Sequence, residues 1–222
     1  MTIQEALTKI LCNEDLSKDE MISVMTQIME GKVNDSLLGA FLTALRMKGE
    51  STTEIVGAAL VMRDKAVRLK VNANPIVDTC GTGGDGGNTF NISTCAAFVV
   101  AGCDITVAKH GNRAVSSRSG SADVLKCLGV NIEAGKAIVE KCIEKIGIGF
   151  LFAPLMHGAM KHAAEVRKEL GFRTIFNILG PLTNPAGAHA QVMGIYDSSR
   201  LKQVAEVLGK LGTRRAFVVN GY

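Results

Sequence analysis

The spacing of hydrophobic residues divides the chain into a helical part and a longer part in which strands and helices alternate. Up to about residue 70, apolar residues recur with the period of amphipathic helices. Capping boxes, in which a Ser or Thr stands three residues before a Glu, predict helix starts at Thr2 with Glu5, Ser17 with Glu20 and Ser51 with Glu54. One more helix is predicted from Asn34-Asp35 to just before Gly49, so we expect four helices in this part.

Beyond a linker at 71–75 the pattern changes to short apolar runs separated by helical stretches. Strands are predicted at 76–79, 105–108, 148–152, 190–196 and 215–219. Helices are predicted from about 93 and at 121–128, 135–146, 158–169 and 198–211. Because this alternation is typical of a mostly parallel sheet, we expect an α/β fold, with a small N-terminal all-helical domain at 1–71 and a larger α/β domain at 72–222.

The helical domain is expected to need a partner surface. A bundle of this size buries little surface by itself, so it should pack on the rest of the chain or on a second subunit. We predict a homodimer formed through this domain; a plain amino-terminal cover for the larger domain is the alternative. A buried type of strand at 216–219 runs directly into a loop, and we therefore expect a truncated chain with an incomplete α/β domain.

Composition and charge narrow the partners. The chain has 222 residues, of which 47% are hydrophobic and 21% charged, and its net charge is +4. Basic residues are mostly interleaved with acidic ones and there is no Trp, which argues against nucleic acid. The amino terminus lacks a signal-peptide pattern, and no apolar run reaches the ~18 residues of a membrane span. We expect a cytoplasmic protein that binds neither nucleic acid nor membrane.

The sulfur-containing residues are expected in the core. The cysteines form no CxxC pair and lie in apolar runs, at 12, 80, 95, 103, 127 and 142. We predict that they are reduced and buried. Core positions are also predicted for Met25, Met29, Met47 and Met62.

The stretch at 177–185 has a purely structural interpretation as a rigid turn.

The most informative stretch for function is a glycine-rich loop between a predicted strand and a helix. It runs from Asp78 to Thr94 and contains five glycines, which allow a ligand to approach the backbone closely. Asn91, Ser93 or Thr94 can cap the following helix, and the first amides of that helix then form an anion site.

A second, basic loop at 109–121 follows the next predicted strand. It carries Lys109, Arg113 and Arg118, with no acidic residue before Asp123. In an open α/β sheet the two loops would meet at the carboxyl ends of the strands. Together they predict a polyphosphate ligand.

Two familiar nucleotide-binding motifs, GxGxxG and the P-loop, do not fit the glycine loop well. Gly81, Gly83 and Gly86 satisfy GxGxxG, but 88–91 separate them from the helix, and Asp85 stands where a pyrophosphate would lie. No Gly-Lys-Ser/Thr closes the loop, which excludes a P-loop. Asp85 suits a ligand that brings a ribose hydroxyl or a hydrated Mg²⁺.

The chain resembles the anthranilate phosphoribosyltransferase family, one of the nucleoside phosphorylase-like phosphoribosyltransferases, along nearly its whole length. The matching motifs are GTGGD at 81–85, NIST at 91–94, KHGNRAVSS at 109–117, SGSAD at 119–123 and RTIFNILGPLTNP at 173–185. The resemblance implies transfer of phosphoribosyl from 5-phosphoribosyl 1-diphosphate to the amine of anthranilate in tryptophan biosynthesis, with Mg²⁺ as cofactor.

The resemblance also implies a set of site residues. Those that would hold the phosphoribosyl diphosphate are Gly81, Gly84, Asp85, Thr89, Asn91, Ile92, Ser93, Thr94, Lys109, His110, Gly111, Asn112, Arg113, Ala114, Val115, Ser116, Ser117 and Ser121. Those that would bind anthranilate are Gly81, Asn112, His157 and Arg167, the last through the carboxylate. Ser93 would also be a ligand of Mg²⁺. No catalytic acid or base is assigned, because the amine is already a nucleophile.

The sequence departs from the family pattern in three places. It lacks the Asp-Glu pair that binds Mg²⁺ soon after the strand matching 216–219, Gly158 replaces a usual Pro, and Asn220 replaces a frequent His. Two alternative functions remain open. The first is a pyrimidine nucleoside phosphorylase, which is disfavoured by the match at 177–185 and by Arg167. The second is a non-catalytic relative that binds anions or nucleic acid, which is disfavoured by the low net charge.

Overall fold

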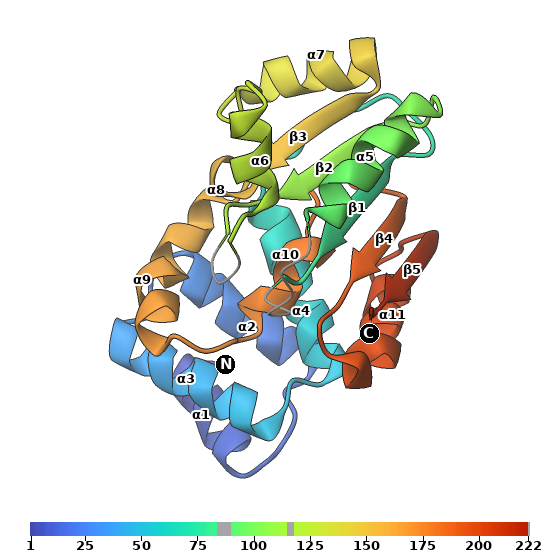
Figure 1. Cartoon of the computed structure of the whole chain (residues 1–222). Coiled ribbons are helices and arrows are strands. Elements are labelled where there is room, and N and C mark those ends of the chain that lie inside the picture. The colour runs from blue at the N-terminus through green and yellow to red at the C-terminus, as the bar shows by residue number, and fades with distance from the viewer. Residues whose placement is uncertain (84–89, 115–117, 222) are drawn as a thin grey trace. The chain divides into compact units, whose positions relative to one another are not determined.

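The computed structural model describes residues 1–83, 90–114 and 118–221 (Figure 1). By its contacts the chain divides into two compact units. The first unit comprises Met1–Ala66 and His157–Thr183, and the second comprises Val67–Met156 and Asn184–Tyr222. Residues 157–183 therefore group by contacts with the amino-terminal helices. The domain boundary between 71 and 72 stays a prediction.

The first unit is helical. Its helices are α1 (Ile3–Leu11), α2 (Lys18–Met29), α3 (Asp35–Lys48), α4 (Thr52–Lys65), the 3₁₀ turn η1 (Gly158–Met160), α9 (Lys161–Leu170) and α10 (Phe176–Leu182). All three predicted capping boxes are formed, at Thr2, Ser17 and Ser51. Asn34 caps α3 by accepting from the Leu37 amide at 2.9 Å. The four helices predicted for the amino-terminal part are confirmed.

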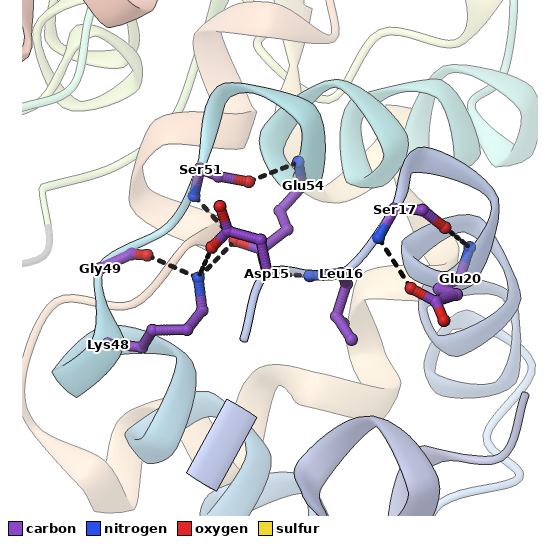
Figure 2. Close-up of polar contacts among 8 residues, drawn as sticks. All are labelled: Asp15, Leu16, Ser17, Glu20, Lys48, Gly49, Ser51 and Glu54. Atoms are coloured by element: carbon purple, nitrogen blue, oxygen red, sulfur yellow. Dashed lines mark hydrogen bonds and ion pairs between the residues drawn. The ribbon is translucent and has the colours of Figure 1, made fainter. Parts of the chain in front are cut away.

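An ion-pair network with a buried Lys48–Glu54 pair joins the end of α3 to the start of α4 (Figure 2). The Lys48 ammonium donates to Asp15 Oδ1 and to Glu54 Oε2, the latter at 3.0 Å. The fully buried Glu54 also accepts from the Leu16 amide at 2.9 Å and the Ser51 amide at 2.7 Å. Burial alone disfavours the Lys48 ammonium, but its bonds to Asp15 and Glu54 raise the pKa of Lys48. Three segments of the bundle are thus held at one buried carboxylate.

The second unit is built on a five-stranded sheet in the order β3-β2-β1-β4-β5. Every pair of neighbouring strands is parallel. The strands are β1 (Val77–Gly81), β2 (Val107–Gly111), β3 (Ile148–Phe152), β4 (Ala190–Gly194) and β5 (Arg215–Val219). The helices are α5 (Ile92–Gly102), α6 (Ser121–Cys127), α7 (Lys136–Ile146), α8 (Ala153–Met156), the 3₁₀ turn η2 (Ser198–Arg200) and α11 (Leu201–Lys210). The predicted fold class, a helical part plus a parallel α/β part, is confirmed.

One hydrophobic cluster of this second unit lies between the sheet and α7. Val139 and Ile143 of α7 pack with Leu151 of β3 and Ala108 of β2, and all four side chains are buried. The edge strand β5 is mostly exposed, and Phe217 on it has 71% of its surface accessible. No helix in the described part of the chain is long and apolar enough to cross a membrane.

The predicted core cysteines are mostly wrong. All six are free thiols, but only Cys80 is buried, Cys142 is half-buried, and Cys12, Cys95, Cys103 and Cys127 are exposed. Cys12 and Cys103 fall at the C-caps of α1 and α5, where the chain leaves the packed face. An apolar run around a cysteine therefore did not show whether the cysteine lies on the buried or the exposed face of its helix.

Three further predictions need correction. Met25, Met29 and Met62 are buried, but Met47 is 83% exposed because it lies on the outer face of α3. The stretch at 177–185 is more than a turn, since α10 occupies its first part and accommodates Pro181 near the helix end. The second strand begins at Val107 instead of 105.

Candidate functional site

In the second unit, the described ends of the two loops predicted to form an anion site lie side by side. The Asn91 side-chain amide donates to Ser119 O at 3.2 Å, and the Thr94 hydroxyl donates to Ser121 Oγ at 2.9 Å. Both bonds join the start of α5 to the end of the basic loop. Asn91, one of the three capping candidates, is the N-cap residue of α5, and its side chain makes no capping bond.

Lys109 stands at the centre of this contact. It comes from β2 and has only 2% of its surface exposed. Its ammonium donates to Thr79 O at 2.6 Å and to Ser93 Oγ at 3.2 Å, and the Thr79 hydroxyl donates to Ser93 O at 2.8 Å. A positive charge is therefore placed against the first turn of α5, where helix amides already favour an anion.

Asp78 is a second buried charge close by, and sequence reasoning gave it no role. It is fully buried on β1, and its Oδ1 accepts from the His110 amide at 3.1 Å. Burial raises the pKa of Asp78, and the nearby Lys109 opposes that rise. Burial likewise lowers the pKa of Lys109, and Asp78 opposes it. The sequence contained one sign of such a role, because an acidic residue within the apolar run 76–80 indicates a function other than packing.

Cys80 and Asn184 complete the surroundings of Lys109 as structural residues. Burial raises the pKa of the Cys80 thiol well above its usual value, which favours a packing role over a nucleophilic one. The buried Asn184 side-chain amide donates to Ala108 O at 2.8 Å, and its Oδ1 accepts from the Ala186 amide at 2.8 Å. Asn184 thereby ties β2 to the following turn.

A single carboxylate oxygen organises the described flanks of the basic loop. Asp123 Oδ2 accepts from the Ala114 amide at 2.9 Å and from the Gly120 amide at 2.8 Å. The bonds from Ala114 and then Gly120 lower the pKa of Asp123. Asn112 O accepts from the Ala122 amide at 3.2 Å, so the residues before and after the loop's centre are joined at several points.

Arg113 lies on this loop with its charge directed to protein groups. Its guanidinium is 3.4 Å from Glu133 and 4.0 Å from Asp123. It also lies over the Phe152 ring at 5.5 Å. Arg113 is thus held by two partially exposed carboxylates, and an anionic ligand could replace the more exposed one, Glu133. Arg118 is exposed.

The residues predicted to bind anthranilate from the first unit are His157 and Arg167. His157 is buried, and desolvation lowers its pKa to about 4, so it is neutral at pH 7. Arg167 is half-buried on α9, and its guanidinium lies over the Phe176 ring at 5.3 Å. Burial lowers the pKa of Arg167. In the described part of the chain, no hydrogen bond or ion pair to a carboxylate is found for this guanidinium.

The remaining predicted residues are placed as follows. Gly81 is exposed at the end of β1, and its missing Cβ leaves room for Gly194 O, which an added Cβ would meet at 3.2 Å. Ile92 is exposed, while His110 is buried on β2. Gly111 and Ser121 are half-buried. The predicted residues Gly84, Asp85, Thr89, Val115, Ser116 and Ser117 lie outside the described residues.

Ser93 can serve as one ligand of Mg²⁺. Its hydroxyl oxygen accepts one hydrogen bond from Lys109, and a hydroxyl oxygen has two lone pairs. Mg²⁺ usually takes few protein ligands and completes its shell with water and substrate phosphates, so a single hydroxyl fits. Within the described residues there is no group of three or more His, Cys, Asp or Glu side chains that could hold a metal.

Asn220, which replaces a frequent His of the family, has a structural role here. Its side-chain amide donates to Ile195 O at 2.7 Å and to Tyr196 O at 3.2 Å. These bonds join the end of β5 to the segment after β4.

Comparison with sequence families gives two matches that together cover most of the chain. The family described as "Glycosyl transferase family, a/b domain" matches residues 73–222. The family described as "Glycosyl transferase family, helical bundle domain" matches residues 4–66.

Several curated relatives carry the same name. An anthranilate phosphoribosyltransferase of Syntrophobacter fumaroxidans is 59% identical over 99% of this chain, which spans 65% of that relative. One from Geotalea uraniireducens is 55% identical, and the chain spans 67% of its length. The chain therefore covers about two thirds of the relatives that it matches.

Solved structures agree with these relatives. A crystal structure of anthranilate phosphoribosyltransferase from Thermus thermophilus superimposes with a TM-score of 0.93 at 49% identity, over 97% of this chain and 65% of that one. The Saccharomyces cerevisiae enzyme in complex with PRPP and Mg has a TM-score of 0.91 at 29% identity, over 99% of this chain and 66% of that one. The same yeast enzyme, in complex with 4-fluoroanthranilate, has a TM-score of 0.86 at 28% identity, over 99% of this chain and 64% of that one.

Proposed function

This chain belongs to the glycosyl transferase family that includes the anthranilate phosphoribosyltransferases, and we propose that its protein transfers phosphoribosyl from 5-phosphoribosyl 1-diphosphate to anthranilate. The products are N-(5-phosphoribosyl)anthranilate and diphosphate. The observation that carries this proposal is the position of the Lys109 ammonium, 3.2 Å from Ser93 Oγ at the start of α5. The names of the relatives favour this reaction over the pyrimidine nucleoside phosphorylase and over a non-catalytic relative.

The chemistry requires stabilisation of a departing anion more than it requires a base. The bond from ribose C1 to the diphosphate oxygen breaks, a bond from C1 to the anthranilate nitrogen forms, and the nitrogen then loses a proton. Negative charge grows on the diphosphate, and we infer that Lys109 and the first amides of α5 stabilise it there. Mg²⁺, when bound with Ser93 as one ligand, would neutralise part of the same charge.

We assign recognition of the anthranilate carboxylate to Arg167. A guanidinium offers a planar pair of donors that suits a carboxylate. The contact with the Phe176 ring holds this group in place, and partial burial strengthens its interaction with an anion. A neutral His157 would present an uncharged wall to the aromatic substrate.

Further parts of the proposal concern the whole protein. We propose a cytoplasmic enzyme of tryptophan biosynthesis that forms a homodimer through the helical unit. A surface groove between α1 and α3 supports the dimer, because it is lined mainly by apolar side chains: Leu7, Ile10, Leu11, Asn13, Ala40, Thr43, Ala44, Met47 and Lys48. Leu11 and Met47 in this groove are 72% and 83% exposed.

The proposed reaction is tested by the decay of anthranilate fluorescence. Purified chain is incubated with phosphoribosyl diphosphate, Mg²⁺ and anthranilate, and we expect turnover that is lost in Lys109→Met. The matched control is Lys126→Met, which removes an exposed lysine from α6. Turnover that survives in Lys109→Met would contradict the role of Lys109. A folded chain that neither turns over nor binds either substrate by calorimetry would contradict the proposed function.

A further inference from the structure

The basic loop is held by an acidic residue that faces its backbone. Asp123 lies in the first turn of α6, three residues after Gly120, and the structure gives its Oδ2 two amide donors, Ala114 at 2.9 Å and Gly120 at 2.8 Å. Carboxylates that accept backbone amides make stronger hydrogen bonds than neutral acceptors do. One oxygen thus fixes the distance between two points of the loop.

The packing around Gly120 shows how close these two points are. A Cβ on Gly120 would stand 2.4 Å from Ala114 N, 2.6 Å from Arg113 C and 2.7 Å from Asn112 O. These are backbone atoms, so the segment 112–114 lies directly against Gly120 with no space for a side chain. The Ala122 amide adds a bond to Asn112 O at 3.2 Å.

We propose that Asp123 is a positioning residue for the phosphoribosyl diphosphate site: its carboxylate sets where Asn112 and Arg113 stand. This inference rests on the proposed function, and it adds a residue to which the resemblance assigned no role. Asp123 is also 4.0 Å from the Arg113 guanidinium, so the same carboxylate acts on both the backbone and the side chain of the residue that it positions. It would not touch the substrate.

Three variants separate this role from a general effect of charge. Asp123→Ala removes both amide bonds. Asp123→Asn keeps a carbonyl oxygen that can accept from both amides but removes the charge. Glu133→Ala is the matched control, because Glu133 also pairs with Arg113, at 3.4 Å, and its only side-chain partner among the described residues is Arg113.

Two measurements are made on the 222-residue chain, well below its unfolding temperature. The first is hydrogen exchange of the Ala114 and Gly120 amides, and the second is calorimetric binding of phosphoribosyl diphosphate with Mg²⁺. For Asp123→Ala we expect faster exchange at both amides and an affinity about tenfold lower. We expect Asp123→Asn to retain most of the protection from exchange and most of the affinity. We expect Glu133→Ala to leave exchange at both amides unchanged.

The outcomes distinguish the two proposals. Wild-type affinity in Asp123→Ala, with folded protein and a binding wild type, would overturn the role of Asp123 and leave the proposed function intact. A wild type that does not bind phosphoribosyl diphosphate would overturn both, whatever the exchange rates are. An equal loss of affinity in Asp123→Ala and Glu133→Ala would also overturn the positioning role, since the effect would then follow the charge near Arg113.

Discussion

At the scale of single residues, the consequential groups are charges and polar side chains removed from water. His157 provides a direct test, because its pKa of about 4 lies below the ordinary value of 6.5. Between these values the unfolded chain binds a proton that the folded chain does not bind. The contribution of the neutral His157 to the free energy of unfolding should therefore be complete above pH 6.5. The free energy of unfolding should fall as the pH drops toward 4, by up to about 3 kcal/mol.

The test compares His157→Gln with wild type in urea at pH 7 and pH 4.5. The variant should lose less stability over this range, since glutamine does not titrate. His162→Gln is the control, because His162 is exposed on α9 of the same unit. If His157→Gln loses as much stability as wild type on acidification, the buried neutral histidine is not the cause.

The buried ion pair between Lys48 and Glu54 provides a second test at this scale. Lys48→Met should lower the free energy of unfolding by about 3 kcal/mol, because it leaves the fully buried Glu54 without its cation. The control is Lys9→Met, which breaks the more exposed pair with Glu20 and should cost less than about 1 kcal/mol. Equal losses in chemical denaturation of the two variants would show that burial does not set the strength of these pairs.

These residues also mark what the sequence could and could not predict. Lys109 was placed in an anion site because it stands in a basic loop after a strand. Its burial was not predictable, since that depends on Thr79 and Ser93, which approach it from other elements. The roles of Asp78 and Asp123 were missed because each accepts an amide from a segment that the sequence does not place beside it: Asp78 accepts from His110, and Asp123 accepts from Ala114.

At the scale of elements, two glycines in helices give opposite predictions for one substitution. Gly57→Ala in α4 should lower the free energy of unfolding by about 1–2 kcal/mol, because its Cβ would stand 2.8 Å from Lys18 O of α2 and 3.0 Å from Met21 Cβ. Gly39→Ala in α3 should raise it by up to about 1 kcal/mol, since the nearest atom would be Val166 Cγ1 at an ordinary 3.8 Å and alanine favours the helix.

Thermal or urea unfolding of the two variants beside wild type measures both signs. Stabilisation by Gly57→Ala would mean that α2 can move away from α4 at little cost. The two glycines look alike in the sequence, because both interrupt an apolar helical face. Capping boxes, in contrast, are local, and all three predicted ones are formed. Local signals therefore predicted where helices begin, and only the fold showed how closely they pack.

At the scale of the whole molecule, the sheet order shows the limit of pattern reasoning. Alternating strands and helices predicted the parallel sheet, which is found. The pairing of β4 with β1, from distant parts of the chain, was not predictable from the alternation. Nor was the grouping of residues 157–183 with the amino-terminal helices, because their helical pattern is the same in either unit.

The proposed homodimer gives the prediction at this scale. Leu11→Asp with Met47→Asp places two charges in the apolar groove between α1 and α3, and desolvating them at an interface would be unfavourable. We expect a dimer for wild type and a monomer for the double variant in sedimentation equilibrium. Both side chains are exposed in the single chain, so the stability of the monomer should change little.

The control for this experiment is Ile138→Asp, which adds a charge at another exposed apolar side chain, 55% accessible, on α7 in the other unit. It should leave the dimer intact, because α7 lies outside the proposed interface. A wild-type monomer at high protein concentration would contradict the dimer itself. A double variant that stays dimeric while Ile138→Asp dissociates would move the interface to the sheet-containing unit, and the apolar groove would then need another explanation.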